Sequence, residues 1–462
     1  MTPRTTPLEP AAALAKLQTY PHQILTWVDD AGYPLSVAVR SSVGGTPPAA
    51  TFDPPAGLLV PTDREVSLTG SHIRPMPGYG YDERRHVTAW GRVADAQGRL
   101  SLQPTKAWGW DEQEVSFFEY SERSVGQSRR YFDALTMERG TPVRPRLARG
   151  WLALRATRLP FLTATLVPVL IGIAIAATHG LFNPLTALLT IVGGSFIQIG
   201  LNVANDVFDT SQGADEVNVT PTKYSGGSRV IQYGLVTLGQ MKVVASASYL
   251  AGMAIGLVLL AISGSVALLV IGIAGVVISL AYTAPPLRLV YRGLGEVAVA
   301  LGFGPLMLVG AYVVQSHGAL AWEPFAASIP IGLLVALILY VNEIPDRRGD
   351  ATAGKRTLPV RLGRDTVVRG YALAAAVAYG ASVLGVVAGV LPIPALAILL
   401  TIPLAGRVHD GLRPNYDNPY ALMAVMASNI KVHAAAGALL LGAYGAVLLA
   451  GALAPSLTLF IR

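Results

Sequence analysis

Long apolar runs alternate with shorter polar segments over most of the chain, from Trp151 to the C-terminus. Each run is close to the roughly 20 residues that a helix needs to cross the hydrocarbon core of a bilayer. The pattern therefore predicts nine transmembrane helices, of which the eighth is the shortest. The predicted spans are roughly 155–178, 184–205, 240–262, 265–283, 294–315, 324–343, 369–389, 391–406 and 432–455.

The first 140 residues have a different pattern, in which short stretches alternate apolar and polar positions. Residues 23–40 predict a strand, a tight turn at Asp30-Ala31-Gly32 and a second strand, and residues 86–102 predict another hairpin. A helix is expected over roughly Ser121 to Met137. The predicted fold class is an all-α multi-span membrane bundle with an N-terminal soluble mixed β-barrel-like domain.

Three regions follow from these patterns. We predict a soluble domain at residues 1–140, a basic linker at 141–150 that lies on an anionic membrane face, and a transmembrane domain at 151–462. The polar, proline-rich start of the chain lacks an apolar core segment, so we expect no cleavable signal peptide.

Composition supports a membrane protein and excludes several kinds of site. Of the 462 residues, 52% are hydrophobic and 14% are charged. The chain has no cysteine, which excludes disulfides, thiolate metal sites and cysteine nucleophiles. Much of the net charge of +7 lies in short loops between the spans, so we read it as a topology signal and expect no nucleic-acid partner.

The loops predict which side of the membrane each part of the chain faces. The loops after spans two, four, six and eight are long and basic, whereas the loops after the odd-numbered spans contain no lysine or arginine. The positive-inside rule then puts the long loops and the N-terminal domain in the cytoplasm, and the C-terminus on the other side.

Two copies of one acidic pattern end the second and sixth spans, both on the predicted cytoplasmic face. In the first copy Asn205 and Asp209 are four residues apart, and in the second Asn342, Asp346 and Asp350 repeat the same spacing. This spacing places the side chains on one face of a helix. Carboxylates at the end of a membrane helix are expensive without a cation or a polar cavity. The alternative is a pair of solvated helix caps.

Such a pair of clusters suits one particular chemistry. Mg²⁺ is usually held by one or two carboxylates together with water and phosphate oxygens, so two opposed helix ends would hold a metal–diphosphate group between them. On an allylic carbon, that group would leave as the metal stabilised its charge. Apolar helices would shield the carbon from water and enclose an isoprenoid tail.

Nearby basic and aromatic residues extend this hypothesis. Lys223, Arg229, Lys355 and Arg356 follow the two clusters and would contact diphosphate oxygens, or else serve only to set the topology or bind anionic lipid. The loop after span four, Y-T-A-P-P-L-R-L-V-Y-R-G-L-G-E, would place further side chains at the cytoplasmic rim, either as a substrate cap or as an ordinary interfacial belt. These are Tyr282, Arg288, Tyr291 and Arg292.

Several motifs in this region resemble those of one known family. From about residue 150 onward, the chain resembles the UbiA superfamily of intramembrane aromatic prenyltransferases. The likeness rests on N-D-V-F-D at 205–209, D-R-R-G-D at 346–350, the loop just quoted, and A-G-K-R-T-L-P-V-R-L-G at 353–363. It implies a Mg²⁺-dependent enzyme, with Asp209, Asp346 and Asp350 as catalytic residues.

The resemblance also implies a ligand set and a reaction. The metal ligands would be Asn205, Asp206, Asp209, Asp215, Asn342, Asp346 and Asp350, and the diphosphate contacts Asn202, Lys223, Arg229, Arg288, Lys355 and Arg356, under a cap of Tyr282 and Tyr291. The substrates would be a polyprenyl diphosphate and a small aromatic acceptor.

Details of the motifs are most similar to the 1,4-dihydroxy-2-naphthoate branch, which makes demethylmenaquinone. The evidence is N-D-V-F-D-T-S-Q-G-A-D, the later G-G-S-R-V-I-Q-Y-G-L-V-T, and the N-E-x-x-D form of the second motif. In the first motif Gly213 occupies the place where the ubiquinone branch usually has an acidic residue, and Asp215 follows two positions later. Relatives use homogentisate, hydroxybenzoate, chlorophyllide or a glycerophosphate, and some act as terpene cyclases.

The N-terminal region loosely resembles the split β-barrel of pyridoxamine-phosphate-oxidase-like flavin proteins, through its strand–turn–strand opening and its aromatic content. That resemblance would imply bound FMN, although the region has no glycine-rich phosphate loop. The alternatives are a regulatory or docking barrel that binds nothing. Two other functions stay open: a membrane-anchored flavin-dependent quinone reductase, and a transporter built from duplicated halves.

Overall fold

The computed structural model describes residues 8–30, 32–75, 81–143 and 147–453, and its contacts divide the chain into two compact units, Met1–Ser124 and Val125–Arg462. Each unit is described by itself. The domain limits at residues 140 and 151 stay predictions. Part of the linker and the end of the ninth predicted span lie outside the described residues, as does Ala31 of the first predicted turn.

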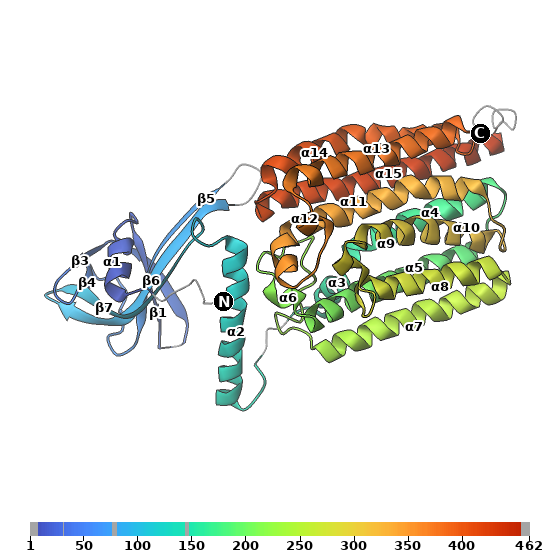
Figure 1. Cartoon of the computed structure of the whole chain (residues 1–462). Coiled ribbons are helices and arrows are strands. Elements are labelled where there is room, and N and C mark those ends of the chain that lie inside the picture. The colour runs from blue at the N-terminus through green and yellow to red at the C-terminus, as the bar shows by residue number, and fades with distance from the viewer. Residues whose placement is uncertain (1–7, 31, 76–80, 144–146, 454–462) are drawn as a thin grey trace. The chain divides into compact units, whose positions relative to one another are not determined.

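The N-terminal unit is a seven-stranded antiparallel sheet with one short helix (Figure 1). Both predicted hairpins are confirmed, with Gln23 opposite Val39 in the first and Ala96 opposite Arg99 in the second. The strand order is β2-β1-β5-β6-β7-β4-β3. The elements are α1 (Pro10–Leu17), β1 (Gln23–Val28), β2 (Pro34–Val39), β3 (Ser41–Gly44), β4 (Ala49–Phe52), β5 (Val66–Pro75), β6 (Tyr81–Ala96) and β7 (Arg99–Asp111).

The sheet curls because its two edge strands are consecutive in the chain. Only Arg40 separates β2 from β3, so the opposite edges of the sheet must come close together. The buried amide of Gln23 holds this corner: it donates to the carbonyl of Leu17 at 2.9 Å and accepts from the backbone N–H of Ser41 at 3.0 Å. The unit is therefore a half-barrel, as the alternating pattern predicted.

Apolar side chains fill the inner side of the half-barrel. Leu14 and Leu17 of α1 are fully buried against Leu25, Phe52 and Leu68 of the strands. Burial of this apolar surface stabilises the half-barrel. Nothing in the described residues of this unit supports the FMN that the split-barrel resemblance implied.

The C-terminal unit is a helical bundle in which each predicted span contains helix (Figure 1). The first span, predicted from residue 155, begins as α4 only at Thr163, because the left-handed backbone of Arg158 ends the preceding helix. Within the described residues, eight helical stretches are long and apolar enough to cross a membrane, and the first span is a shorter apolar helix. The spans are α4 (Thr163–Thr178), α5 (Pro184–Ser211), α7 (Leu238–Ser263), α8 (Val266–Thr283), Gly295–Gln315 (α9, Gly295–Leu301; η3, Gly302–Val309; α10, Gly310–Gln315), α11 (Trp322–Thr352), α13 (Arg364–Val387), Ile393–Asn415 (η4, Ile393–Thr401; α14, Ile402–Asn415) and α15 (Pro419–Leu453).

Local sequence signals begin several of these helices. The side chain of Asn183 caps α5, Thr237 forms a capping box with Gln240 on α7, and Ser265 caps α8. Each cap satisfies backbone N–H groups that the first helical turn leaves without partners. The remaining helices are α2 (Phe117–Arg139), which crosses the unit boundary and includes the predicted helix, and the shorter α3 (Arg149–Thr157), η1 (Leu159–Leu162), α6 (Ala214–Val217), η2 (Leu289–Arg292) and α12 (Leu358–Arg361).

Several helices extend beyond their predicted ends, and in two of them the extension positions the acidic clusters. The prediction stopped the second span at residue 205 and the sixth at residue 343, where polar residues end the apolar run. The helical backbone instead continues to Ser211 and to Thr352. Both acidic clusters are thus the last turns of long, rigid helices, at the end of the bundle where α3, α6 and α12 lie (Figure 1).

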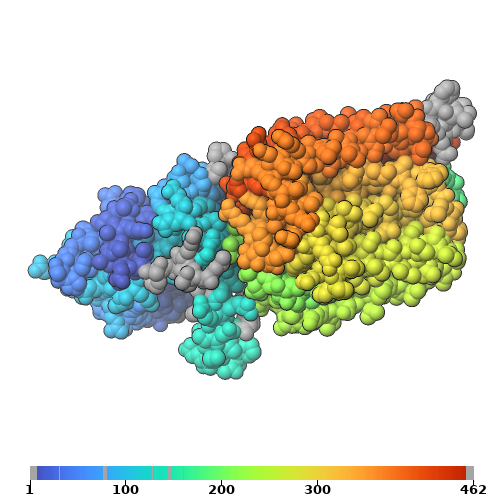
Figure 2. All heavy atoms as spheres, viewed as in Figure 1, coloured from blue at the N-terminus to red at the C-terminus, as the bar shows by residue number. Residues whose placement is uncertain are grey.

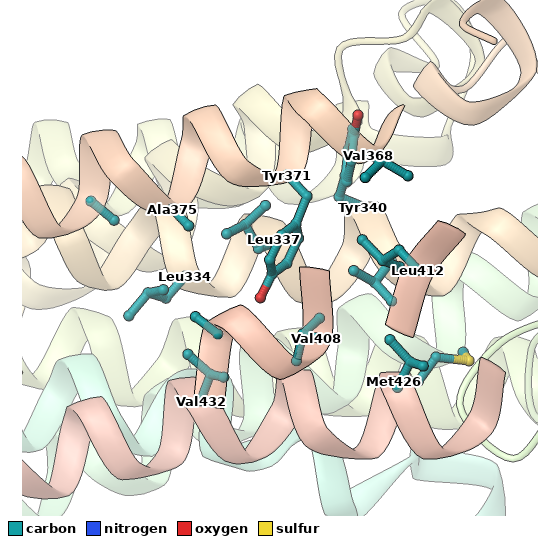
Figure 3. Close-up of a cluster of buried hydrophobic side chains, with 14 of the residues drawn as sticks. Leu334, Leu337, Tyr340, Val368, Tyr371, Ala375, Val408, Leu412, Met426 and Val432 are labelled. Atoms are coloured by element: carbon teal, nitrogen blue, oxygen red, sulfur yellow. The ribbon is translucent and has the colours of Figure 1, made fainter. Parts of the chain in front are cut away.

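A buried cluster contributed by α11, α13, α14 and α15 holds the second of these helices in place (Figure 3). Within it, the hydroxyl of Tyr371 donates to the side chain of Asn429 at 3.0 Å, and Asn429 donates to the carbonyl of Leu337 at 2.8 Å. Pairing these polar groups removes the cost of burying them among apolar side chains.

Candidate active site

The ends of α5 and α11 face each other across a polar pocket of about 180 Å³. Six of the seven predicted metal ligands line this pocket. The seventh, Asp206, is not among the lining residues. The six that line it are Asn205, Asp209, Asp215, Asn342, Asp346 and Asp350.

Lys355 joins the two helix ends through their carboxylates. Its ammonium donates to Asp209 at 3.1 Å and lies 3.9 Å from Asp350, and its side chain is only 13% exposed. Burial alone would lower the pKa of Lys355, but the carboxylates of Asp209 and Asp350 outweigh that effect and hold the pKa well above its ordinary value. The lysine therefore stays charged and offsets part of the negative charge of Asp209 and Asp350.

The predicted cap residue Tyr291 also contacts the first cluster. Its hydroxyl donates to the second oxygen of Asp209 at 2.8 Å. Burial and the charge of Asp209 raise the pKa of Tyr291 well above its ordinary value, so it stays a hydrogen-bond donor. Asp209 is thus oriented by a phenol and an ammonium, one on each oxygen.

The loop between α6 and α7 binds the second cluster. The carboxylate of Asp346 accepts hydrogen bonds from the side chain of Asn218 at 2.9 Å, the hydroxyl of Ser225 at 3.0 Å and the backbone N–H of Gly226 at 2.8 Å. Two residues later, the N–H of Ser228 donates to Asp206 of the first cluster at 3.1 Å. This segment, residues 218–228, links both helix ends.

The sequence assigned no role to Asn218, Ser225, Gly226 or Ser228, although the motif that begins at Gly226 carried part of the resemblance. The available signal was Gly226-Gly227, because two consecutive glycines between serines indicate a backbone that ordinary residues cannot adopt. Both glycines have left-handed φ angles, of 74° and 75°. A Cβ built on Gly227 would lie 3.1 Å from an oxygen of Asp206 and 3.3 Å from an oxygen of Asp215.

We therefore expect Gly227→Ala to lower kcat/KM by between about tenfold and a hundredfold, because small displacements of positioned groups have large effects on rate. Gly213→Ala is the matched control: Gly213 also has a left-handed φ, of 78°, but its Cβ would meet nothing within 4 Å. Both variants carry the same backbone strain, of about 1–2 kcal/mol. Steady-state kinetics with melting curves separate the two effects, and equal losses of activity would contradict the crowding of the carboxylates.

Asp215 lies on the short helix α6 and is buried next to the first cluster. Burial, and then the charges of Asp209 and Asp206, raise the pKa of Asp215 well above its ordinary value. Its backbone carbonyl accepts from the guanidinium of Arg229. A cation in the pocket would therefore stabilise the charged form of Asp215.

The predicted diphosphate contacts separate into two groups. Asn202 and Lys355 line the pocket, as does the predicted cap residue Tyr282. The other four do not line it. Lys223 and Arg356 are exposed, and Arg288 donates to Gln212 at 2.8 Å. Arg229 is buried and donates to the backbone carbonyl of Asp215. Their role stays a prediction.

Arg158 also lines the pocket, and the sequence did not single it out as a site residue. Its backbone is left-handed, with a φ of 54°, where α3 ends. A chain of amides lies beside it, in which Gln198 donates to Asn202 and Asn202 donates to the carbonyl of Thr157, both at 3.2 Å. No sequence signal marks this turn.

A divalent cation fits the donor set of the pocket. Among the described residues, no three His, Cys, Asp or Glu side chains are grouped closely enough to hold a metal alone. This suits Mg²⁺, which takes one or two carboxylates and completes its shell with water and phosphate. Several buried side-chain oxygens of the described residues lack a hydrogen-bond partner, and three of them belong to predicted metal ligands, namely Asn205, Asp206 and Asn342.

A larger apolar cavity lies between α5, α7, α8 and the Gly295–Gln315 span. Its volume is about 500 Å³. It shares the lining residues Gln198, Leu201, Tyr282, Val299 and Phe303 with the polar pocket, so the two spaces adjoin each other. The arrangement offers an acidic end for an anion that carries a divalent cation and a long apolar end for a hydrocarbon chain.

Comparison with known proteins identifies the class. Residues 165–430 match the model of the UbiA prenyltransferase family. The chain belongs to this family, and it is an integral membrane prenyltransferase that crosses the membrane several times. The resemblance inferred from the motifs is thereby confirmed, as is the prediction of an enzyme.

Curated relatives cover most of the helical unit. The chain is 27% identical over 316 residues to a 2-carboxy-1,4-naphthoquinone phytyltransferase from Synechocystis sp.. The matched region covers 67% of this chain and 98% of the relative. It is 32% identical over 221 residues to the 1,4-dihydroxy-2-naphthoate octaprenyltransferase of Escherichia coli, covering 46% of this chain and 69% of the relative.

Among solved structures, the chain is similar to a UbiA homolog from Archaeoglobus fulgidus bound to DMAPP and Mg²⁺. The TM-score is 0.45 with 14% identity, over 63% of this chain and 99% of that one.

Proposed function

We propose that the protein transfers a polyprenyl group from a polyprenyl diphosphate to 1,4-dihydroxy-2-naphthoate, in a Mg²⁺-dependent reaction of menaquinone biosynthesis. One observation carries the proposal: a pocket lined by two acidic helix ends and Lys355 lies directly beside an apolar cavity with which it shares lining residues. A diphosphate joined to an isoprenoid tail has the same division of charge. The acceptor is proposed from the names of the curated relatives.

The acidic helix ends would hold the metal. Asp209 and Asp215 would bind it on one side and Asp346 and Asp350 on the other, with amide oxygens of Asn205 and Asn342. When bound, Mg²⁺ would neutralise the diphosphate and make it a better leaving group. The ammonium of Lys355 would move from Asp209 to a diphosphate oxygen, which offers a charge-assisted hydrogen bond.

The apolar part of the pocket would protect the reacting carbon. Val299, Phe303 and Val335 line the polar pocket next to Tyr282 and exclude water from its inner end. The reaction then breaks the allylic C–O bond and forms a C–C bond to the electron-rich ring. For a dihydroxynaphthoate, the carboxylate leaves the attacked ring carbon as CO₂, so the ring keeps its electron pair and no proton has to be removed from that carbon.

We also propose the side of the membrane. The lysine- and arginine-rich loops leave the same end of the bundle as the pocket, which supports a cytoplasmic active site and a cytoplasmic N-terminal domain. Reporter fusions after Gln315 and after Asp350 test this orientation.

An acceptor panel tests the reaction. Purified protein, Mg²⁺ and a polyprenyl diphosphate are incubated with 1,4-dihydroxy-2-naphthoate, homogentisate or 4-hydroxybenzoate, and products are measured by mass spectrometry. We expect a prenylated naphthoquinol with one equivalent of CO₂. A product with another acceptor only would refute the naphthoate assignment, and no release of diphosphate with any acceptor would refute prenyl transfer from these donors.

A further inference from the structure

Two arginines that precede the first span donate hydrogen bonds to the segment between α6 and α7. Arg155 of α3 donates through its Nε to the carbonyl of Ser228 at 2.9 Å. Arg129 of α2 donates to the carbonyl of Gln232 at 3.1 Å. Both arginines belong to the helical unit, and both come before residues 165–430, the region that matches the family model. These contacts therefore involve a part of the chain that the family model does not cover.

Each of the two acceptor residues also contacts the first acidic cluster. The backbone N–H of Ser228 donates to Asp206 at 3.1 Å. The side-chain amide of Gln232 donates to the hydroxyl of Thr210 at 2.8 Å and to the carboxylate of Asp215 at 3.4 Å. Ser228, Gln232 and both aspartates are buried. Each arginine is thus linked to one buried carboxylate through a single residue.

The segment between Ser228 and Gln232 continues into a compact turn. The backbone N–H groups of Tyr233 and Gly234 donate to carbonyls within this turn, both at 2.9 Å. The guanidinium of Arg155 also lies over the ring of Tyr233, with its central carbon 5.5 Å from the ring centre. The two arginines therefore hold a segment that is already ordered by its own hydrogen bonds.

The two arginines differ in their exposure to solvent. Arg155 is half-buried, whereas Arg129 is exposed on α2, which lies at the surface of the molecule (Figure 2). Water competes for the hydrogen bonds of an exposed charged group, so such contacts contribute less. We therefore expect Arg155 to have the larger effect on the acidic cluster.

We propose that Arg129 and Arg155 are positioning residues, which hold Ser228 and Gln232 and thereby keep Asp206 and Asp215 in the arrangement that binds a divalent cation. The inference rests on the proposed function, in which the first acidic cluster holds Mg²⁺. Neighbouring carboxylates repel each other, so the cluster would separate more often without this support. A smaller population of the binding arrangement raises the apparent Kd for the metal by the same factor, and saturating metal restores binding.

Mg²⁺ titrations of prenyl transfer provide the first test. Arg155→Met removes the donor and keeps a long side chain. It should raise the Mg²⁺ concentration for half-maximal activity about tenfold, and lower kcat at saturating Mg²⁺ by less than about twofold. Arg129→Met should raise that concentration about threefold, because its hydrogen bond is exposed. Arg155→Lys keeps a charged donor and should recover most of the difference.

The matched controls come from the same two helices. Arg130 on α2 and Arg149 on α3 are exposed, and within the described part of the chain neither donates to the segment at 228–232. Arg130→Met and Arg149→Met should leave the Mg²⁺ requirement unchanged. Loss of a positive charge by itself strengthens the binding of a cation. The expected weakening in the Arg129 and Arg155 variants therefore has the opposite sign to a general effect of charge.

Melting curves with Mg²⁺ alone provide a readout that needs no turnover. Binding to the folded state raises the melting temperature according to the ratio of free metal to its Kd. Arg155→Met should therefore need about ten times the Mg²⁺ concentration that gives the same increase in the wild type. A purely structural role would instead lower the melting temperature by the same amount with and without Mg²⁺.

The outcomes separate this inference from the proposed function. Prenyl transfer by the wild type, with an unchanged Mg²⁺ requirement in Arg155→Met and Arg129→Met, would overturn the positioning role and leave the function intact. A loss of kcat at every Mg²⁺ concentration, or tighter Mg²⁺ binding in both variants, would do the same. A wild type that Mg²⁺ stabilises but that transfers no prenyl group would refute the function, and the melting curves would still decide the role of the arginines. A wild type that does not respond to Mg²⁺ in either assay would refute both.

Discussion

Replacing Asp209 with asparagine is expected to lower kcat/KM for prenyl transfer by about 10²- to 10³-fold, while the protein remains folded. Asparagine keeps the shape of the side chain and removes its charge. In the wild type, that charge accepts from Tyr291 at 2.8 Å and from Lys355 at 3.1 Å, and it faces the second acidic helix end across the pocket. Loss of a preorganised charged group next to the reacting atoms typically has an effect of this size.

Kinetics at saturating Mg²⁺, together with a melting curve, measure this effect. The matched control is Asp410→Asn on α14, where the carboxylate is 82% exposed and lies outside the pocket. It should change neither activity nor stability noticeably, because isolated surface charges contribute little. Activity of the Asp209 variant within threefold of the wild type would rule out a role for this carboxylate in holding the metal and diphosphate.

Much of the bundle is predictable from the sequence, because the bilayer imposes a simple requirement. An apolar run must be helical over its whole length to satisfy its backbone hydrogen bonds in lipid, so hydropathy locates each span. The ends are less predictable. Asn205 and Asn342 interrupt the apolar runs, but helical hydrogen bonding continues past them to Ser211 and Thr352. Hydropathy therefore locates the end of the apolar run, whereas the helix itself continues beyond that point.

Spacing of four residues similarly predicted that Asp346 and Asp350 share a helix face with Asn342, and the structure places all three on one pocket. The contacts around them depend on tertiary structure. Ser225 and Gly226 reach Asp346 from more than a hundred positions away in the chain, and no local pattern encodes that approach. Charge alone likewise could not predict that Lys355 lines the pocket while its neighbour Arg356 is exposed.

Removal of the ammonium by Lys355→Met should make the stability of the protein depend on Mg²⁺. Without metal, the variant keeps two buried carboxylates, Asp209 and Asp350, which are 6% and 9% exposed and have lost their nearby positive charge. Breaking a buried ion pair by removing one partner typically costs about 3–5 kcal/mol. A divalent cation in the same pocket would restore the balance of charge.

Melting curves with EDTA and with millimolar Mg²⁺ measure the two states. The variant should melt well below the wild type in EDTA, and Mg²⁺ should raise its melting temperature by more than it raises that of the wild type. Lys242→Met, which removes an exposed lysine from α7, is the control and should respond to Mg²⁺ as the wild type does. The contrary outcome is a Lys355 variant that melts at the wild-type temperature in EDTA and whose melting temperature does not change with Mg²⁺. That result would rule out the idea that Lys355 and the metal ion neutralise the same carboxylates. Mg²⁺ raises the melting temperature only if it binds the folded protein more tightly than the unfolded chain. A larger increase in the variant than in the wild type would therefore also show that Mg²⁺ and the ammonium of Lys355 compete for the same carboxylates.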